Sequence, residues 1–268
     1  MESQKKDLRI SQKIEYEIQA NKQLVYIGFI FMCAKFFIDL LFDLFSIFTI
    51  GFSFSNLFTI MYFVRIILQI FSVIGTVVLV IGLTKLRNNF AGAFNTSLKK
   101  ITLFLGIGFG YLYIFSFSIN LITPSWGIFT EIIYVINRIV GIASFIIIIL
   151  AIIEIRKAIN ELVKILPTYN TSFLSLYPII ASYIIFSITT VLSIVFHYVE
   201  FNLTIYSYIY YALAILCNVA LGLGMIEIGT KFKQINEYEI AHLAQISQER
   251  QSITDFPFND EDESIKDL

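Results

Sequence analysis

The chain has 268 residues, of which 57% are hydrophobic, and its formal net charge is -1. A mean hydropathy of +0.78 lies far above the range of soluble domains and excludes that class of protein. Six membrane helices of about 20 residues each would occupy nearly half of the chain, which leaves no length for an additional soluble domain. We therefore expect one all-α integral membrane domain with short polar tails.

Residues 1–23 are polar and mixed in charge, with a small excess of basic residues, and they precede the first apolar run. We expect them to form a cytoplasmic segment, because the apolar run after them is longer than the hydrophobic part of a cleavable signal peptide. A thin line of apolar side chains beside several lysines favours a helix on an anionic lipid surface here.

Six apolar runs follow, and each is long enough to cross about 30 Å of hydrocarbon as a helix. The runs are 24–45, 57–83, 101–122, 128–153, 173–195 and 205–225. Three connections between them contain no Lys or Arg, namely 46–56, 123–127 and 196–204. The other two connections are basic, so the sequence predicts six transmembrane helices joined by loops that alternate in charge.

The distribution of basic residues predicts the orientation of these helices. Sixteen of the 19 Lys and Arg residues lie on one side of this topology, and the other three lie within spans. Lysines and arginines in short loops mark the cytoplasmic side, so we expect both termini in the cytoplasm. Residues 232–251 are expected to extend the last helix there, and the acidic residues 252–268 to form a disordered tail.

An internal repeat accompanies the six spans. An Asn precedes each odd-numbered span, and a Thr and a Lys mark the start and end of each even-numbered span. These positions are Asn21, Asn95 and Asn170, then Thr59, Thr130 and Thr204, then Lys85, Lys157 and Lys231. Repetition at a fixed period indicates repeated structural units. The membrane domain, residues 24–231, is thus predicted to be three tandem αα-hairpins (about 21–85, 95–157 and 170–231), related by an axis along the membrane normal.

Two local patterns predict helix starts and helix packing. The Asn-Thr-Ser triplets at 95–97 and 170–172 are interpreted as helix starts, at which a Ser or Thr oxygen caps free backbone amides. Gly106 and Gly110 form a small-residue pair in the third span, and Ala220 and Gly224 form another in the sixth. Small residues of this spacing favour close approach of neighbouring helices.

Charged and polar side chains within the spans are the candidate functional residues. The set is Lys35, Asp39, Asp43, Arg65, Gln69, Glu131 and Arg138. Lys35, Asp39 and Asp43 are four residues apart, which places them on one helix face. A charge at a helix centre costs about 2.5–3.5 kcal/mol on insertion scales, so these groups need compensation. Their signs balance, and we expect them between the membrane middle and its outer face, where Asp39 and Arg65 are within reach of each other.

Two interpretations of this charged set stay open. The groups line a water-filled vestibule that takes a small polar or ionic solute, or they form a dry, neutral network that fixes the helices in register. Replacing Arg65 by Gln distinguishes the two. A wet cavity leaves folding largely intact, because water solvates Asp39, whereas a dry network loses assembled protein.

The sequence offers little for an enzyme, and we expect none, with no catalytic residue, cofactor or metal. His197 and His242 fall on opposite sides of the predicted bilayer, so they form no shared metal or haem site. Cys33 and Cys217 lie in apolar runs and form no CxxC pair. Motifs of serine hydrolases, zinc proteases and P-loop proteins are absent from the sequence.

The leading hypothesis is a transporter or channel-like protein for a small polar or ionic solute. The alternative is a non-transporting membrane scaffold or accessory subunit, whose intramembrane charge network is structural. The expected partners are the lipid bilayer, the solute, and a second copy or another membrane protein, with no nucleic acid.

Overall fold

A computed structural model describes residues 2–49, 55–90, 92–115, 128–166, 176–198 and 203–236. The chain separates into two compact units, one of residues 20–235 and a smaller one of residues 1–19 and 236–268. In the smaller unit the described residues 2–19 are helical, and the Lys13 ammonium lies 4.0 Å from the Glu17 carboxylate one turn later. The expected tail, 252–268, and most of the expected extension, 232–251, lie outside the described residues.

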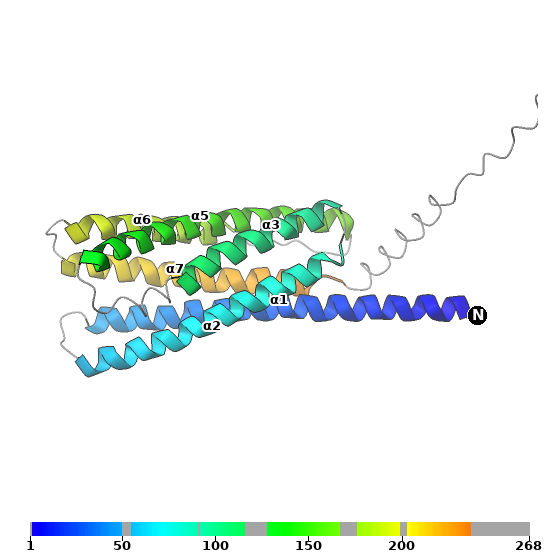
Figure 1. The fold of residues 1–268 in the computed structure, drawn as a ribbon, viewed down its shortest axis with the longest axis horizontal. Coiled ribbons are helices and arrows are strands. Elements are labelled where there is room, and N and C mark those ends of the chain that lie inside the picture. Colours follow the sequence, from blue (N-terminus) through cyan, green and yellow to red (C-terminus); the bar gives the residue numbers. More distant parts are fainter. Residues whose placement is uncertain are drawn as a thin grey trace, which may run out of the picture. The chain divides into compact units, whose positions relative to one another are not determined.

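The described part of the chain consists of helices. They are α1 (Glu2–Thr49), α2 (Ser55–Arg87), α3 (Gly92–Phe109), the π-helix η1 (Gly110–Phe115), α5 (Ile128–Ile165), α6 (Tyr177–Tyr198) and α7 (Leu203–Lys233). Within the larger unit they lie side by side (Figure 1), with α3 packed on α2 and α5, and α6 on α5 and α7. The prediction of an all-helical protein is confirmed.

Five helices among the described residues are long and apolar enough to cross a membrane. They cover 12–48, 69–87, 132–164, 177–196 and 205–233. The chain is therefore a membrane protein with several spans. The third predicted span, 101–122, begins in α3 and η1, and its residues after Phe115 lie outside the described ones. Six spans, the triplication and the orientation of the termini stay predictions.

Several predicted basic segments meet at one end of the larger unit, which we call the basic end. The Asn21 amide donates to the Asn89 side chain at 3.1 Å, which joins α1 to the α2–α3 turn. The Lys22 ammonium donates to the backbone oxygen of Ile235 at 2.8 Å, just beyond α7. This lysine side chain satisfies a carbonyl near a helix C-terminus, where the helix dipole also favours a positive charge.

The turn between α2 and α3 corrects the prediction for the triplet at 95–97. Helix α3 begins at Gly92, whose φ of 71 is in the left-handed region and allows the sharp reversal. Asn95 is already inside the helix, and its side chain donates to the backbone oxygens of Arg87 and Phe90. Thr96 donates to the oxygen of Gly92. Asn95 of the triplet therefore binds the end of α2 instead of capping α3. The second triplet, 170–172, lies outside the described residues.

Buried side chains are concentrated toward the basic end. On α1 they include Val25, Phe29 and Phe36, and on α7 they run from Ala214 to Ile228 and beyond. By contrast, residues 37–48, 132–143, 190–196 and 205–213 include no buried residue. We call the half of the larger unit that contains these four ranges the open half, and the other half the basic half.

Glycines permit the close packing of the basic half. A Cβ at Gly28 would lie 2.7 Å from the Leu79 Cα, so α1 and α2 approach to backbone contact there. A Cβ at Gly224 would meet the Ile179 side chain of α6, so α6 and α7 also pack closely there, as predicted for Gly224. The prediction for the third span is wrong in its residues. A Cβ at Gly106 would make only ordinary contact and one at Gly110 would meet nothing within 4 Å, whereas Gly108 faces Ile148 of α5.

Candidate functional site in the open half

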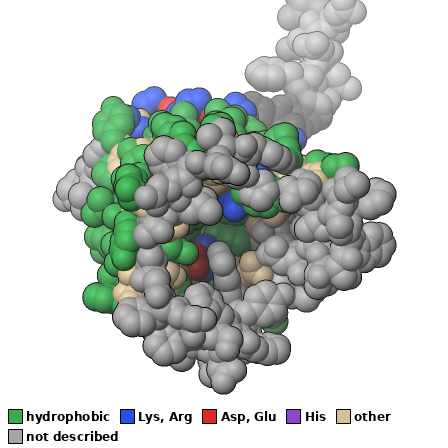
Figure 2. Space-filling view, turned by 90° about the vertical axis from the view of Figure 1, so that its left-hand side faces the viewer, with side chains coloured by type: hydrophobic (Ala, Val, Ile, Leu, Met, Phe, Trp, Pro, Cys, Tyr) green, Lys and Arg blue, Asp and Glu red, His purple; other side chains and the backbone are tan. Residues whose placement is uncertain are grey.

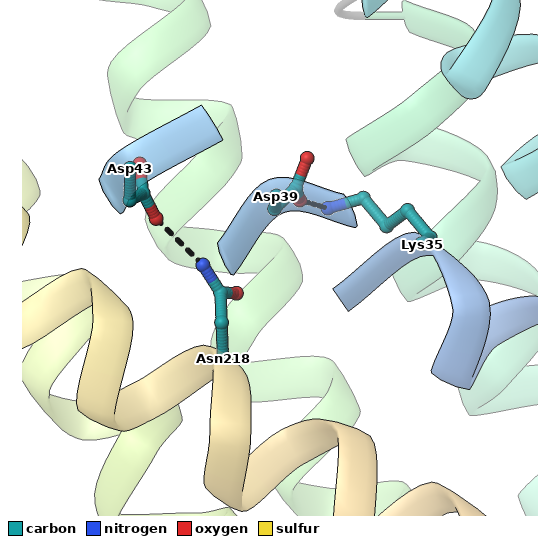
Figure 3. Close-up of polar contacts among 4 residues, drawn as sticks. All are labelled: Lys35, Asp39, Asp43 and Asn218. Carbon is teal, nitrogen blue, oxygen red and sulfur yellow. Dashed lines mark hydrogen bonds and ion pairs between the residues drawn. The ribbon is translucent and has the colours of Figure 1, made fainter. Parts of the chain in front are cut away.

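Helix α1 brings its three predicted charged residues to one face at the inner edge of the open half. Their spacing of four residues follows the helical repeat. Lys35 forms an ion pair with Asp39 (Figure 3), and the two side chains are 16% and 27% exposed. A charged pair on a membrane helix is costly unless it is paired and hydrated. The Lys35–Asp39 pair satisfies the first condition.

Asp43, one turn further along α1, is bonded to a different helix. The Nδ2 atom of Asn218 on α7 donates to Oδ2 of Asp43 at 2.8 Å (Figure 3), and the two residues are 175 positions apart in sequence. Asn218 is buried, with 4% exposed. Asn218 was not among the predicted site residues. The sequence did indicate it, because Asn218 is the only Asn in the apolar run 205–225. An amide there needs a polar partner in hydrocarbon.

The Lys35 ammonium also connects α1 with η1. It lies 5.0 Å from the ring centre of Phe36 and 5.1 Å from the ring centre of Tyr113. Cations are attracted to aromatic faces at such distances, and the attraction is stronger where water is scarce. The positive charge is therefore shared between a carboxylate and two aromatic rings.

Arg138 lies in a separate group on α5. Its guanidinium is 5.0 Å from the ring centre of Tyr134 and acts electrostatically on Tyr206 of α7. The Tyr206 hydroxyl donates to the Thr189 backbone oxygen at 3.1 Å, which ties α7 to α6. No ion pair joins Arg138 to a carboxylate among the residues whose side chains are described. Among the described side chains, the charged residues thus form two groups, one on α1 and one around Arg138, and a network that includes Arg65 and Glu131 stays a prediction.

The structure describes only some of the remaining predicted residues. Gln69 on α2 is half-buried. The side chains of Arg65 and Glu131 lie outside the described ones, so the predicted meeting of Arg65 with Asp39 stays a prediction. Further along α2, Thr76 is buried and donates to the backbone oxygen of Ser72, which satisfies its hydroxyl within the helix.

The open half is hollowed at its end. Figure 2 looks onto the end at which α1 finishes and α7 begins, and acidic and basic side chains are visible inside the hollow. The described charged residues of this region are Lys35, Asp39, Asp43 and Arg138. Hydrated charges cost far less than charges in hydrocarbon.

The basic end carries a second polar depression, but its charges are paired. Its lining includes Ser97, Asn160 and two lysines. Lys157 bonds to Glu154 at 2.7 Å, and Lys164 bonds to Glu161 at 2.8 Å. Each lysine that lines the depression is therefore already paired with a carboxylate on its own helix.

The chemistry that this arrangement can supply is binding by charge and hydrogen bonds. Among the described residues, no group of three or more His, Cys, Asp or Glu side chains is arranged to hold a metal ion. No protein-family model, curated protein or solved structure matches the chain. The function is therefore inferred from the side chains of the open half.

Proposed function

We propose that this multi-pass membrane protein moves a small polar or ionic solute across its membrane, with the open half as the outer vestibule. The observation that carries the proposal is the partly exposed Lys35–Asp39 pair, where α1 enters a stretch without buried residues (37–48), together with the charged side chains visible in the hollow at this end (Figure 2). The proposal includes six spans, cytoplasmic termini and no enzymatic activity.

Energetics support a hydrated site. Removing a carboxylate and an ammonium from water costs several kcal/mol for each ion, and their attraction offsets this only with complete hydrogen bonding. Asp39 remains 27% exposed although it is paired with Lys35. Contact with lipid is unfavourable for a carboxylate. The exposed surface of Asp39 is therefore more stable in contact with water in the hollow.

Within this vestibule the charged side chains have distinct roles in binding a solute. The Lys35–Asp39 pair offers one donor group and one acceptor group to a polar solute. Asp43, held by Asn218, adds a carboxylate whose position is fixed between two helices. Arg138, above the Tyr134 ring, supplies a separate positive charge. A solute with both donor and acceptor groups would engage this set better than an apolar one.

One observation favours a second candidate function. The Asn218–Asp43 bond connects the first and last described helices of the larger unit at a buried amide. Such a bond fixes helix register, which is the main requirement of a scaffold or accessory subunit that binds another membrane protein or a second copy. In that case the polar groups are structural.

A solute-dependent stability screen on the purified protein separates the two functions. Specific binding to the folded state raises the apparent stability, by about 2.7 kcal/mol at a hundredfold excess over the dissociation constant. We expect ions or one class of small polar solute to raise the melting temperature. The rise should be lost in Asp39→Asn and kept in Lys164→Gln, a control at the basic end. No shift with ions, amino acids, sugars or nucleotides would contradict transport and favour the scaffold.

A further inference from the structure

Two tyrosine hydroxyls in the interior of the larger unit have no protein partner among the described residues. The side chains are Tyr113 on η1 and Tyr183 on α6, with exposures of 3% and 1%. A buried hydroxyl without a hydrogen bond is strongly disfavoured, and native proteins rarely leave one unsatisfied. Two such groups in one interior need a common explanation.

The contacts of the two rings show where the hydroxyls lie. The Lys35 ammonium, which is paired with Asp39, lies 5.1 Å from the centre of the Tyr113 ring. The Tyr183 ring packs against Phe145 of α5, with 5.8 Å between the ring centres. Tyr113 is therefore at the inner edge of the charged site, and Tyr183 is in the interior between α5 and α6.

The backbone at Tyr113 supplies a second, independent indication. Helix α3 passes at Gly110 into the six-residue π-helix that carries Tyr113. The π-helix is rare and occurs mainly as single turns within α-helices, frequently at functional sites. Within η1, Tyr111 is exposed and Tyr113 is buried.

We infer that the hydroxyls of Tyr113 and Tyr183 hold internal water at the base of the open half. Buried waters typically make about three hydrogen bonds to polar groups that have no other partner. Two phenol hydroxyls and the neighbouring Lys35–Asp39 pair offer these bonds. Water bridging them satisfies both tyrosines and extends the hydrated region from the hollow to the π-helix. This inference extends the proposed vestibule inward, but it depends on no particular solute.

Substituting each tyrosine by phenylalanine tests the inference through the sign of the stability change. Phenylalanine keeps the ring and removes only the hydroxyl. If water bridges the hydroxyls, Tyr113→Phe and Tyr183→Phe each lower the melting temperature in detergent by a few degrees. The double variant loses less than the sum of the two, because residues that share one bridge are coupled. Tyr208→Phe, on α7 and 43% exposed, is the control and should change nothing.

The opposite sign would overturn the inference. A dry interior gains stability when an unsatisfied hydroxyl is removed, so an unchanged or raised melting temperature in either single variant contradicts bound water. Additive losses in the double variant contradict a shared bridge. The two experiments test different proposals. A scaffold that binds no solute would give no shift in the solute screen, but its Tyr→Phe variants would still lose stability if water is bound.

Discussion

The two halves of the larger unit are built from the same apolar helices but pack differently. In the basic half, Gly28 brings α1 to the backbone of α2, and Lys22 fastens α1 to the chain just beyond α7. In the open half the same α1 contains no buried residue over 37–48, and the Lys35–Asp39 pair is partly exposed. Phe37, at the start of this range, is still met by Gly222 of α7.

The difference in packing indicates where substitutions should destabilise this protein and where they should be tolerated. Helices in lipid associate through close packing and hydrogen bonds, since the surrounding chains are as apolar as the helices. The basic half has both kinds of interaction. The open half has polar contacts without close packing, which is the arrangement that a binding region needs. Substitutions should therefore have very different effects in the two halves.

The largest effect is expected at a glycine of the basic half. In Gly28→Ala the new Cβ would lie 2.7 Å from the Leu79 Cα, and backbone cannot move away as a flexible side chain can. Overpacking of this kind costs typically 1–3 kcal/mol, and we expect about 3 kcal/mol here. Thermal unfolding of the purified protein in detergent measures the loss.

Gly141→Ala is the matched control in the open half. A Cβ at Gly141 meets nothing within 4 Å, so the substitution should only improve helix propensity, by up to about 1 kcal/mol. Equal losses at Gly28 and Gly141 would show that the two halves pack alike.

A smaller loss is expected at the junction of α1 with the end of α7. Lys22→Met keeps the apolar stem and removes the ammonium that donates to the Ile235 oxygen. A hydrogen bond from a charged group contributes about 1.5–3 kcal/mol, so we expect a loss of about 2 kcal/mol in chemical unfolding. Lys85→Met, at an exposed position of the same end, should stay within about 0.5 kcal/mol of the parent protein. Similar losses in both variants would mean that general charge, and not this bond, stabilises the basic end.

The sequence predicted those features of the structure that depend on the spacing of residues within a single helix. The charges of Lys35, Asp39 and Asp43 lie on one face because helical spacing requires it. The Lys157–Glu154 pair follows from the same rule. The α5 helix, however, extends to Ile165, beyond the apolar run that predicted its end at 153. An exposed basic segment can remain helical outside a membrane, so hydropathy alone does not mark the helix end.

Contacts between distant helices were not predictable. Asn218 meets Asp43 because α7 returns beside α1, and nothing local to either residue specifies that pairing. Helix tilt makes Gly108, and not Gly106 or Gly110, the glycine that faces Ile148. The π-helix at Gly110 has no comparable sequence signal. Such features depend on packing among several helices.

Thiol labelling of the two halves tests most directly whether the open half is hydrated. With Cys33 and Cys217 replaced by serine, a cysteine is introduced by Asp43→Cys in the open half or by Leu98→Cys in the basic half. Leu98 is fully buried. A charged, membrane-impermeant thiol reagent should modify the cysteine at position 43 at least tenfold faster than the one at position 98. Equally slow modification of both in the folded protein would contradict a water-filled vestibule and leave a dry structural network.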